Sequence, residues 1–179
     1  MKGADVFFAL RLAGAAAVFA AARLLGAWAG AYAFIAPASR CAALLSGSPQ
    51  PEHGPGGILL RVGGGVVSVD ASCSGALFFA VLCAGLFWIF SARLRSAGGL
   101  AASAALSIAA AYPLAIAANA CRIAACARAY ILCGGVLPQK YHAAAHMACS
   151  TACFFFFLLV FSILAVKGSD YVKSRFGPA

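Results

Sequence analysis

The stretch that decides the fold class is SGALFFAVLCAGLFWIFSA, residues 74–92. It carries no charged side chain, and Arg93 and Arg95 follow it. A helix needs about 20 mostly apolar residues to cross a bilayer, and basic residues at its end hold it at the headgroups. The stretch therefore predicts a membrane-spanning helix.

Three further stretches have the same character. Residues 96–121 and 147–166 carry no charge, and each is followed by a basic residue. Residues 6–34 are apolar but contain Arg11 and Arg23, so we expect one long, tilted helix there. Arg11 can extend to the nearer headgroups, whereas Arg23 should face protein or the far interface because a charge in lipid is costly. The sequence thus predicts about four spans.

The composition of the whole chain agrees with this prediction. Of its 179 residues, 64% are hydrophobic and 9% are charged, whereas a soluble domain carries roughly 25% charged residues. A soluble globule could not bury so much apolar surface, and a disordered chain would be poorer in it. We therefore expect a single all-α integral membrane domain, residues 1–179, built as a bundle of about four transmembrane helices.

The net charge of +9 comes from 13 basic and four acidic residues. In a membrane protein such an excess indicates loops that fix the orientation, so we expect contact with the lipid bilayer and not with nucleic acid. With the N-terminus inside, the inner side holds more basic residues than the outer side. The inner set is Lys2, Arg11, Arg93, Arg95, Lys167, Lys173 and Arg175, and the outer set is Arg40, Arg61, Arg122, Arg128 and Lys140. We therefore expect both termini in the cytoplasm.

Two segments are not expected to span the bilayer. Residues 37–72 are rich in Gly, Pro and Ser and should form an extracytoplasmic loop, in which ILLRVGGGVVSVD, residues 58–70, predicts a β-hairpin. A two-residue turn at Gly64-Gly65 would sort apolar and polar side chains onto separate faces. The expected pairs are Val62 with Val67, Leu60 with Val69, and Arg61 with Ser68. The second segment, residues 123–141, is half polar and predicts a short helix at the outer surface.

Cys73 lies in the run DASCSG, residues 70–75, at the start of the predicted span over residues 74–92. Asp70 and Ser72 are good N-cap residues, so we expect Cys73 in the first turn of a helix on the outer side. A helix N-terminus stabilises a thiolate, the reactive form of cysteine. The alternative is a small buried hydrophobic residue. We keep that interpretation for the other cysteines, at positions 41, 83, 121, 126, 133, 149 and 153.

Other polar residues are expected at the same outer face. Asn119 and Arg122 are three apart and share a helix face, and a permanently charged guanidinium can stabilise an oxyanion. His142 and His146 are four apart, just before the last span, and imidazole is suited to proton transfer near neutral pH. The simpler alternative for each is an interfacial anchor that reaches the headgroups.

A metal site that uses both histidines with Cys149 or Cys73 is a rival interpretation. The sequence does not cluster the acidic or thiolate partners that zinc requires beside the histidines, so we expect no metal and no cofactor. A candidate thiolate, a fixed cation and an imidazole, on three different spans, are instead the groups that acyl transfer at a peptide bond requires.

Three short motifs carry a family resemblance. Cys73-Ser74-Gly75 resembles a Cys-Ser-Gly motif, and ANACRI, residues 118–123, resembles Ala-Asn-x-x-Arg-Ile. HMACSTACF, residues 146–154, resembles His-x-x-x-Gly-x-x-x-Phe, with Ser150 in place of Gly. In this order, over about residues 58–166, the chain resembles the exosortase/archaeosortase family of integral-membrane cysteine transpeptidases. Many members of the family have about eight spans and this chain is shorter, so it resembles the compact exosortases, such as the exosortase K group.

The resemblance implies roles for individual residues. Cys73 would be the nucleophile, Arg122 the transition-state stabiliser and His146 the general acid/base. His142 is the second choice, because only His146 places Ser150 and Phe154 in register. Asn119 would orient Arg122 or the substrate carbonyl, and Ser74 and Gly75 complete the first motif as supporting residues.

The resemblance also implies a function. Such an enzyme would cleave the C-terminal sorting signals of exported proteins, which consist of a short motif, a transmembrane helix and a basic tail. It would act at the outer face of a bacterial cytoplasmic membrane through a thioester, which water or an amine on a lipid or glycan would resolve. Two other classes are a membrane thiol oxidoreductase, which a Cys-x-x-Cys spacing would favour, and a small transporter or non-enzymatic subunit, which two similar halves would favour. The sequence contains neither feature.

Overall fold

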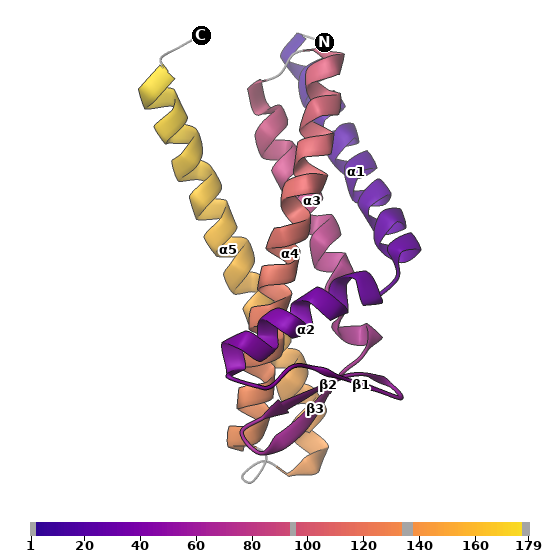
Figure 1. The fold of residues 1–179 in the computed structure, drawn as a ribbon. Helices are drawn as coiled ribbons and strands as arrows, with labels where there is room; N and C mark the ends of the chain where they lie inside the picture. Colours follow the sequence, from indigo (N-terminus) through magenta and orange to yellow (C-terminus); the bar gives the residue numbers. More distant parts are fainter. Residues whose placement is uncertain (1–2, 94–95, 134–137, 177–179) are drawn as a thin grey trace.

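Four long helices form a bundle whose one end is covered by a short helix and a small sheet (Figure 1). The computed structural model describes residues 3–93, 96–133 and 138–176. The helices are α1 (Gly3–Ala29), α2 (Tyr32–Ser46), α3 (Ala76–Phe90), α4 (Ala97–Cys133) and α5 (His142–Phe176). The strands are β1 (Glu52–Gly54), β2 (Gly57–Val62) and β3 (Gly65–Val69), and short 3₁₀ turns are η1 (Ala71–Cys73), η2 (Ser91–Arg93) and η3 (Gln139–Tyr141). The start of α1 and the end of α5 lie at the end of the bundle opposite the sheet (Figure 1).

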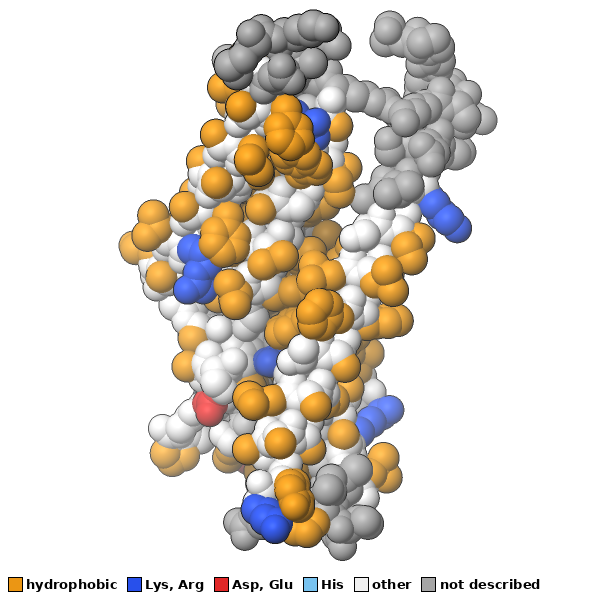
Figure 2. Space-filling view, turned by 180° about the vertical axis from the view of Figure 1, so that it is seen from behind, with side chains coloured by type: hydrophobic (Ala, Val, Ile, Leu, Met, Phe, Trp, Pro, Cys, Tyr) orange, Lys and Arg blue, Asp and Glu red, His pale blue; other side chains and the backbone are white. Residues whose placement is uncertain are grey.

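The expected number of long apolar helices is confirmed. Four segments are long and apolar enough to cross a membrane, Val6–Ala29, Ala71–Phe90, Gly98–Leu132 and Ala143–Leu164. Large apolar side chains cover their outer faces (Figure 2), among them Trp28 at 88% and Phe155 at 68% exposure. In water such a surface would drive aggregation, whereas lipid accepts it. These features indicate a multi-pass membrane protein.

The first helix and the following loop differ from the prediction. The prediction of one helix over residues 6–34 was wrong. Helix α1 ends at Ala29, and Gly30, with a φ of 75°, turns the chain into α2. The prediction that a loop begins at residue 37 was also wrong, because α2 continues through Pro37 to Ser46. Pro37 cannot donate to the carbonyl of Ala33, one turn earlier, and the Tyr112 hydroxyl of α4 donates to that carbonyl instead, at 2.7 Å. A contact from a distant helix therefore makes the proline tolerable.

The end of α2 is satisfied by two devices. Gly47 adopts the left-handed conformation at the C-cap, with a φ of 64°, and the N–H of Ser48 donates to the carbonyl of Ala43 at 2.9 Å. Arg128 of α4 donates from Nη2 to the carbonyl of Leu45 at 2.9 Å. A cation is favourable at this negative end of a helix, so Arg128 fixes α2 across the end of the bundle.

The predicted hairpin is present, with a different register and one more strand. Its turn is Gly63-Gly64, with φ values of 54° and 82°, and not Gly64-Gly65. The observed pairs include Leu60 with Val67 and Ile58 with Val69, each two residues from the predicted partner, so every side chain keeps its face. This register adds the buried pair Ile58–Val69. The unpredicted strand β1 lies on the other side of β2, where Glu52 and Arg61 form an exposed bidentate ion pair at 2.9 and 3.0 Å.

The prediction of a short surface helix over residues 123–141 was also wrong. Up to Cys133 this segment continues α4, and residues 134–137 lie outside the described part. Ile123, Ala124 and Ala127 are buried, so packing holds the extension helical although half of its residues are polar or small. The consequence for the site is that α4 extends past the level of Cys73 to the sheet.

Candidate active site

Cys73 lies in η1, between the sheet and α3. The Oδ1 atom of Asp70 accepts hydrogen bonds from the N–H and the hydroxyl of Ser72, at 2.9 and 2.5 Å, and so caps this turn as expected. Both hydrogen bonds hold the pKa of the Asp70 carboxyl below its usual value, and the bond from the Ser72 hydroxyl has the larger effect. However, α3 begins only at Ala76, so Cys73 precedes the helix and is not in its first turn. The cysteine is 8% exposed.

Gly75 determines where α3 begins. Its φ is 71°, in the left-handed region that side chains disfavour, and a Cβ atom there would lie 3.1 Å from Cγ of Asn119. Both constraints require glycine at this position. Gly75 therefore lets α4 approach the Cys73 turn closely enough for Asn119 to reach its carbonyls.

Asn119 and Arg122 form a buried hydrogen-bond network around the main chain of Cys73. Asn119 Nδ2 donates to the carbonyls of Cys73 and Ser74, at 2.7 and 3.2 Å, and its Oδ1 accepts from Arg122 Nε at 3.0 Å. Arg122 Nη2 donates to the Cys73 carbonyl at 2.9 Å. The two side chains are 1% and 5% exposed. The predicted shared helix face thus brings both side chains to the main chain of the Cys73 turn.

Arg122 is a buried cation that keeps hydrogen-bonding capacity. In the described ranges it has no carboxylate partner, and protein atoms accept from Nε and Nη2 only. The guanidinium lies over the ring of Phe154, 5.1 Å from its centroid, which compensates part of the cost of burying the charge. A buried cation without a carboxylate partner, beside a cavity, is suited to stabilise a negative charge that develops there.

His146 reaches the same place from α5. Ser150 and Phe154, on the same face of α5 as His146, hold this helix against the others. Ser150 Oγ lies 3.6 Å from Cys126 Sγ of α4. Phe154 stacks on Phe78 of α3, with centroids 4.6 Å apart. The four-residue spacing of His146, Ser150 and Phe154 therefore points all three toward α3 and α4. The side chain of His142 lies outside the described residues.

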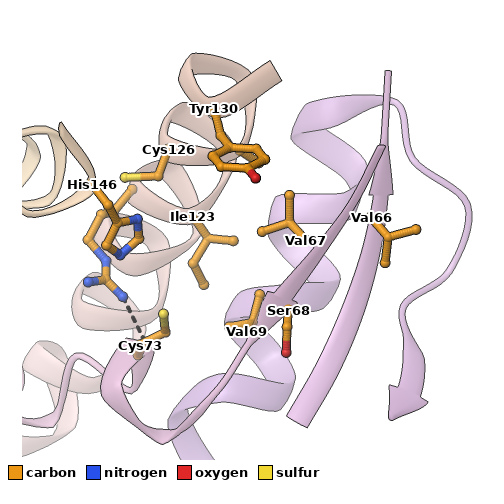
Figure 3. Close-up of a pocket in the computed structure, with 11 residues that line it drawn as sticks. Val66, Val67, Ser68, Val69, Cys73, Ile123, Cys126, Tyr130 and His146 are labelled. Atoms are coloured by element: carbon orange, nitrogen blue, oxygen red, sulfur yellow. Dashed lines mark hydrogen bonds between the residues drawn. The ribbon is translucent and has the colours of Figure 1, made fainter. Parts of the chain in front are cut away.

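A cavity of about 280 Å³ joins these groups (Figure 3). Cys73, Arg122 and His146 line one part of it, and β3 faces α4 across the rest. Its lining residues are Val66, Val67, Ser68, Val69, Cys73, Arg122, Ile123, Cys126, Ala127, Tyr130 and His146. A second cavity, of about 380 Å³, also reaches Arg122, and is lined by Arg23, Ser74, Gly75, Phe78 and Phe154 among others. Arg23 is an exposed side chain that lines this cavity.

The sequence motifs missed part of this site. The strand β3 and Cys126 line the cavity, and neither belongs to a predicted site. Cys126 could have been found, because it follows Arg122 by four residues and so shares its helix face. The strand could not, since no short motif marks it.

Within the described ranges no group of three or more His, Cys, Asp or Glu side chains is arranged to hold a metal ion. The rival zinc site would need His142, whose side chain is outside those ranges. The groups that do converge are a thiol, a guanidinium, an amide and an imidazole.

Comparisons of the chain with protein-family models, with curated proteins and with solved structures found no match. The function is therefore argued from the residues of this cavity.

Proposed function

We propose that this protein is a membrane-embedded cysteine protease/transpeptidase of the exosortase kind. It cleaves the C-terminal sorting signals of exported proteins at the outer face of the bacterial cytoplasmic membrane. The observation that carries the proposal is that Cys73, Arg122 and His146, from three separate helical segments, line one cavity.

The reaction begins with the thiol. His146 accepts the proton of Cys73, and the thiolate sulfur attacks the carbonyl carbon of the scissile peptide bond. The carbonyl oxygen becomes an oxyanion, which the free N–H groups of Arg122 stabilise. When the C–N bond breaks, the protonated His146 gives its proton to the leaving amine, and the tail fragment departs. The substrate remains bound to Cys73 as a thioester.

Asn119 is the positioning residue of this reaction. It bridges Arg122 Nε and the carbonyls of Cys73 and Ser74, so it fixes the guanidinium and the sulfur relative to one another. Preorganisation of this kind spares the site from rearranging when charge develops. Ser74 and Gly75 serve the same purpose through the main chain.

The second half of the reaction regenerates the enzyme. The acceptor is water or an amine of a lipid or glycan. It attacks the thioester carbonyl while His146 takes a proton from the attacking group. The Cys73 thiolate leaves and recovers a proton from His146. An amine acceptor gives transpeptidation, and water gives proteolysis.

Topology supports the outer face as the place of reaction. The sheet and α2 lie at one end of the bundle, and the start of α1 and the end of α5 lie at the other (Figure 1). The cavity lies at the end with the sheet, because β3 lines it. In the sequence the denser basic pairs follow the spans that end at Phe90 and Leu164, and by the positive-inside rule these span ends are cytoplasmic.

The experiment is Cys73→Ala in cells that carry a tagged exported protein ending in a short motif, a transmembrane helix and a basic tail. Loss of the cleaved product is expected. Cys41→Ala is the matched control, because Cys41 is exposed on α2, and it should process normally. Undiminished cleavage in Cys73→Ala would show that another residue is the nucleophile.

A further inference from the structure

The strand β3 forms one wall of the cavity. The cavity touches four consecutive residues of β3, Val66 to Val69, although successive side chains of a strand point to opposite faces. A space that meets both faces of one strand lies along its edge. Figure 3 shows β3 on one side of this space, with Ile123, Cys126 and Tyr130 of α4 across it.

That edge of β3 has no strand partner in the described ranges. The sheet order is β1-β2-β3, so β3 pairs with β2 on one side only. In a hairpin with a two-residue turn, the flanking pair Val62–Gly65 exchanges hydrogen bonds, and every second pair repeats the exchange. The N–H and C=O groups of Val66 and Ser68 therefore point away from β2. Arg61 of β2 lies opposite Val66, so its carbonyl should also point away from the β2–β3 pair. It does, because it accepts a hydrogen bond from the Ser48 hydroxyl.

The groove is continuous with the candidate nucleophile. β3 runs toward Asp70 and η1, so a chain paired with β3 has one end beside Cys73. The lining holds one permanently charged side chain, Arg122, together with the imidazole of His146 and no carboxylate. This charge favours carbonyl oxygens and acidic groups and excludes a basic segment. The occupant must therefore offer main-chain donors and acceptors and keep any basic tail outside.

We infer that an extended segment of the substrate protein adds to β3 as a fourth strand, hydrogen-bonded to Val66 and Ser68, which delivers its scissile carbonyl to Cys73. The inference rests on the proposed function. In strand addition the main chain supplies affinity and the pockets for alternate side chains supply specificity. A neutral or acidic extended segment without proline at the positions that face β3 is the class of peptide this edge accepts.

The test uses acetyl-tetra-alanyl chloromethyl ketone on the full chain in lipid nanodiscs, with chloroacetamide as the small reagent. In either reaction the Cys73 sulfur forms a bond to the methylene carbon, chloride leaves, and the thiol proton passes to the medium. The second-order rate constant is measured from the mass of the Cys73 peptide. A chloromethyl ketone alkylates thiols faster than chloroacetamide does, so each rate constant is divided by that of the same reagent with free N-acetylcysteine. On this scale we expect the tetrapeptide to react at least tenfold faster than chloroacetamide.

Two changes separate strand pairing from other causes of that gain. N-methylation of the probe at one amide at a time should reduce the rate about fivefold at alternate positions only, since one hydrogen bond is lost at each. Ser68→Pro removes an outward N–H but no bond of the β2–β3 ladder, and should reduce the peptide rate by a similar factor. His53→Pro is the matched control, because it removes an outward N–H on the opposite edge, at β1.

The two failures are distinct. If chloroacetamide leaves Cys73 unmodified, the nucleophile is wrong and the proposed function falls. If chloroacetamide reacts but the tetrapeptide gains nothing, or its gain survives every N-methylation and Ser68→Pro, pairing with β3 is wrong and the proposed function stands.

Discussion

Arg11 and Arg122 contact main-chain carbonyls at the two ends of α3, and the comparison separates a structural arginine from one that we propose to act in catalysis. Arg11 donates from Nη2 to the Trp88 carbonyl at 2.7 Å, in the last turn, and lies 4.2 Å from the centroid of the Trp88 ring. A cation is favourable at this negative end of a helix. Arg122 lies at the opposite end, where the helix dipole is positive and a cation is disfavoured.

The stability of α3 therefore explains Arg11 and does not explain Arg122. A buried cation at the unfavourable end of a helix, beside a thiol and a cavity, is an arrangement typical of functional sites. The same positive helix end and the guanidinium both favour a thiolate or an oxyanion at this place. The two arginines thus predict opposite results when each is replaced by lysine.

The largest effect is expected for Arg122→Lys. Lysine keeps the charge but lacks the planar fork that bridges Asn119 and the Cys73 carbonyl while it faces the cavity. We expect cleavage to fall by about 10²–10³, the usual effect of losing an oxyanion donor. Arg11→Lys should lower the thermal midpoint and leave cleavage within about twofold. Equal losses of activity in the two variants would remove the distinction between them.

The next effect concerns the proton carrier. His146→Gln should reduce cleavage by about 10²–10⁴, because proton transfer to the leaving amine is lost. His142→Gln, measured in parallel, should keep the rate. A loss of cleavage that follows His142 instead would reassign the acid/base.

A smaller effect is expected at Gly75. Alanine there meets Asn119 and a φ of 71°, so Gly75→Ala should destabilise the fold by roughly 1–2 kcal/mol and reduce cleavage by displacing Asn119. Gly85→Ala is the control within α3, because its Cβ atom would meet nothing within 4 Å. It should stabilise the helix by up to about 1 kcal/mol. Thermal unfolding in detergent measures both, and a neutral Gly75→Ala would contradict the close approach of α4.

The smallest effect is the pH dependence from Asp70. Its carboxyl has a lowered pKa in the folded state, so it contributes stability above its unfolded pKa, and this contribution is lost as the pH falls through the folded pKa. The difference in thermal midpoint between the natural chain and Asp70→Asn should therefore be present at pH 6 and shrink as the pH falls below about 4. A difference that grows on acidification would contradict the sign of this shift.

Local signals predicted the long helices and most of the site. Apolar length alone was enough for the four helices, and the spacing of Asn119, Arg122 and His146 placed them with Cys73. What the sequence could not supply depends on contacts between distant segments. The helix α2 passes through Pro37 because Tyr112 satisfies the freed carbonyl, and packing of Ile123 extends α4.

The hairpin shows the same limit more finely. Three consecutive glycines allow two turns, and only burial of the additional Ile58–Val69 pair distinguishes them. The predicted faces were correct, but the turn was not. Since the turn sets which backbone groups of β3 face the cavity, the cavity wall could be recognised only from the fold.

The most direct test of the central claim is to intercept the thioester. The full chain in nanodiscs is incubated with a tagged protein that carries a sorting signal, in the presence of neutral hydroxylamine, and the released fragment is weighed. Attack of hydroxylamine on a Cys73 thioester predicts a fragment that ends in a hydroxamate, absent in Cys73→Ala. A cleaved fragment that ends only in a free carboxylate, with no acyl group found on Cys73, would contradict the account.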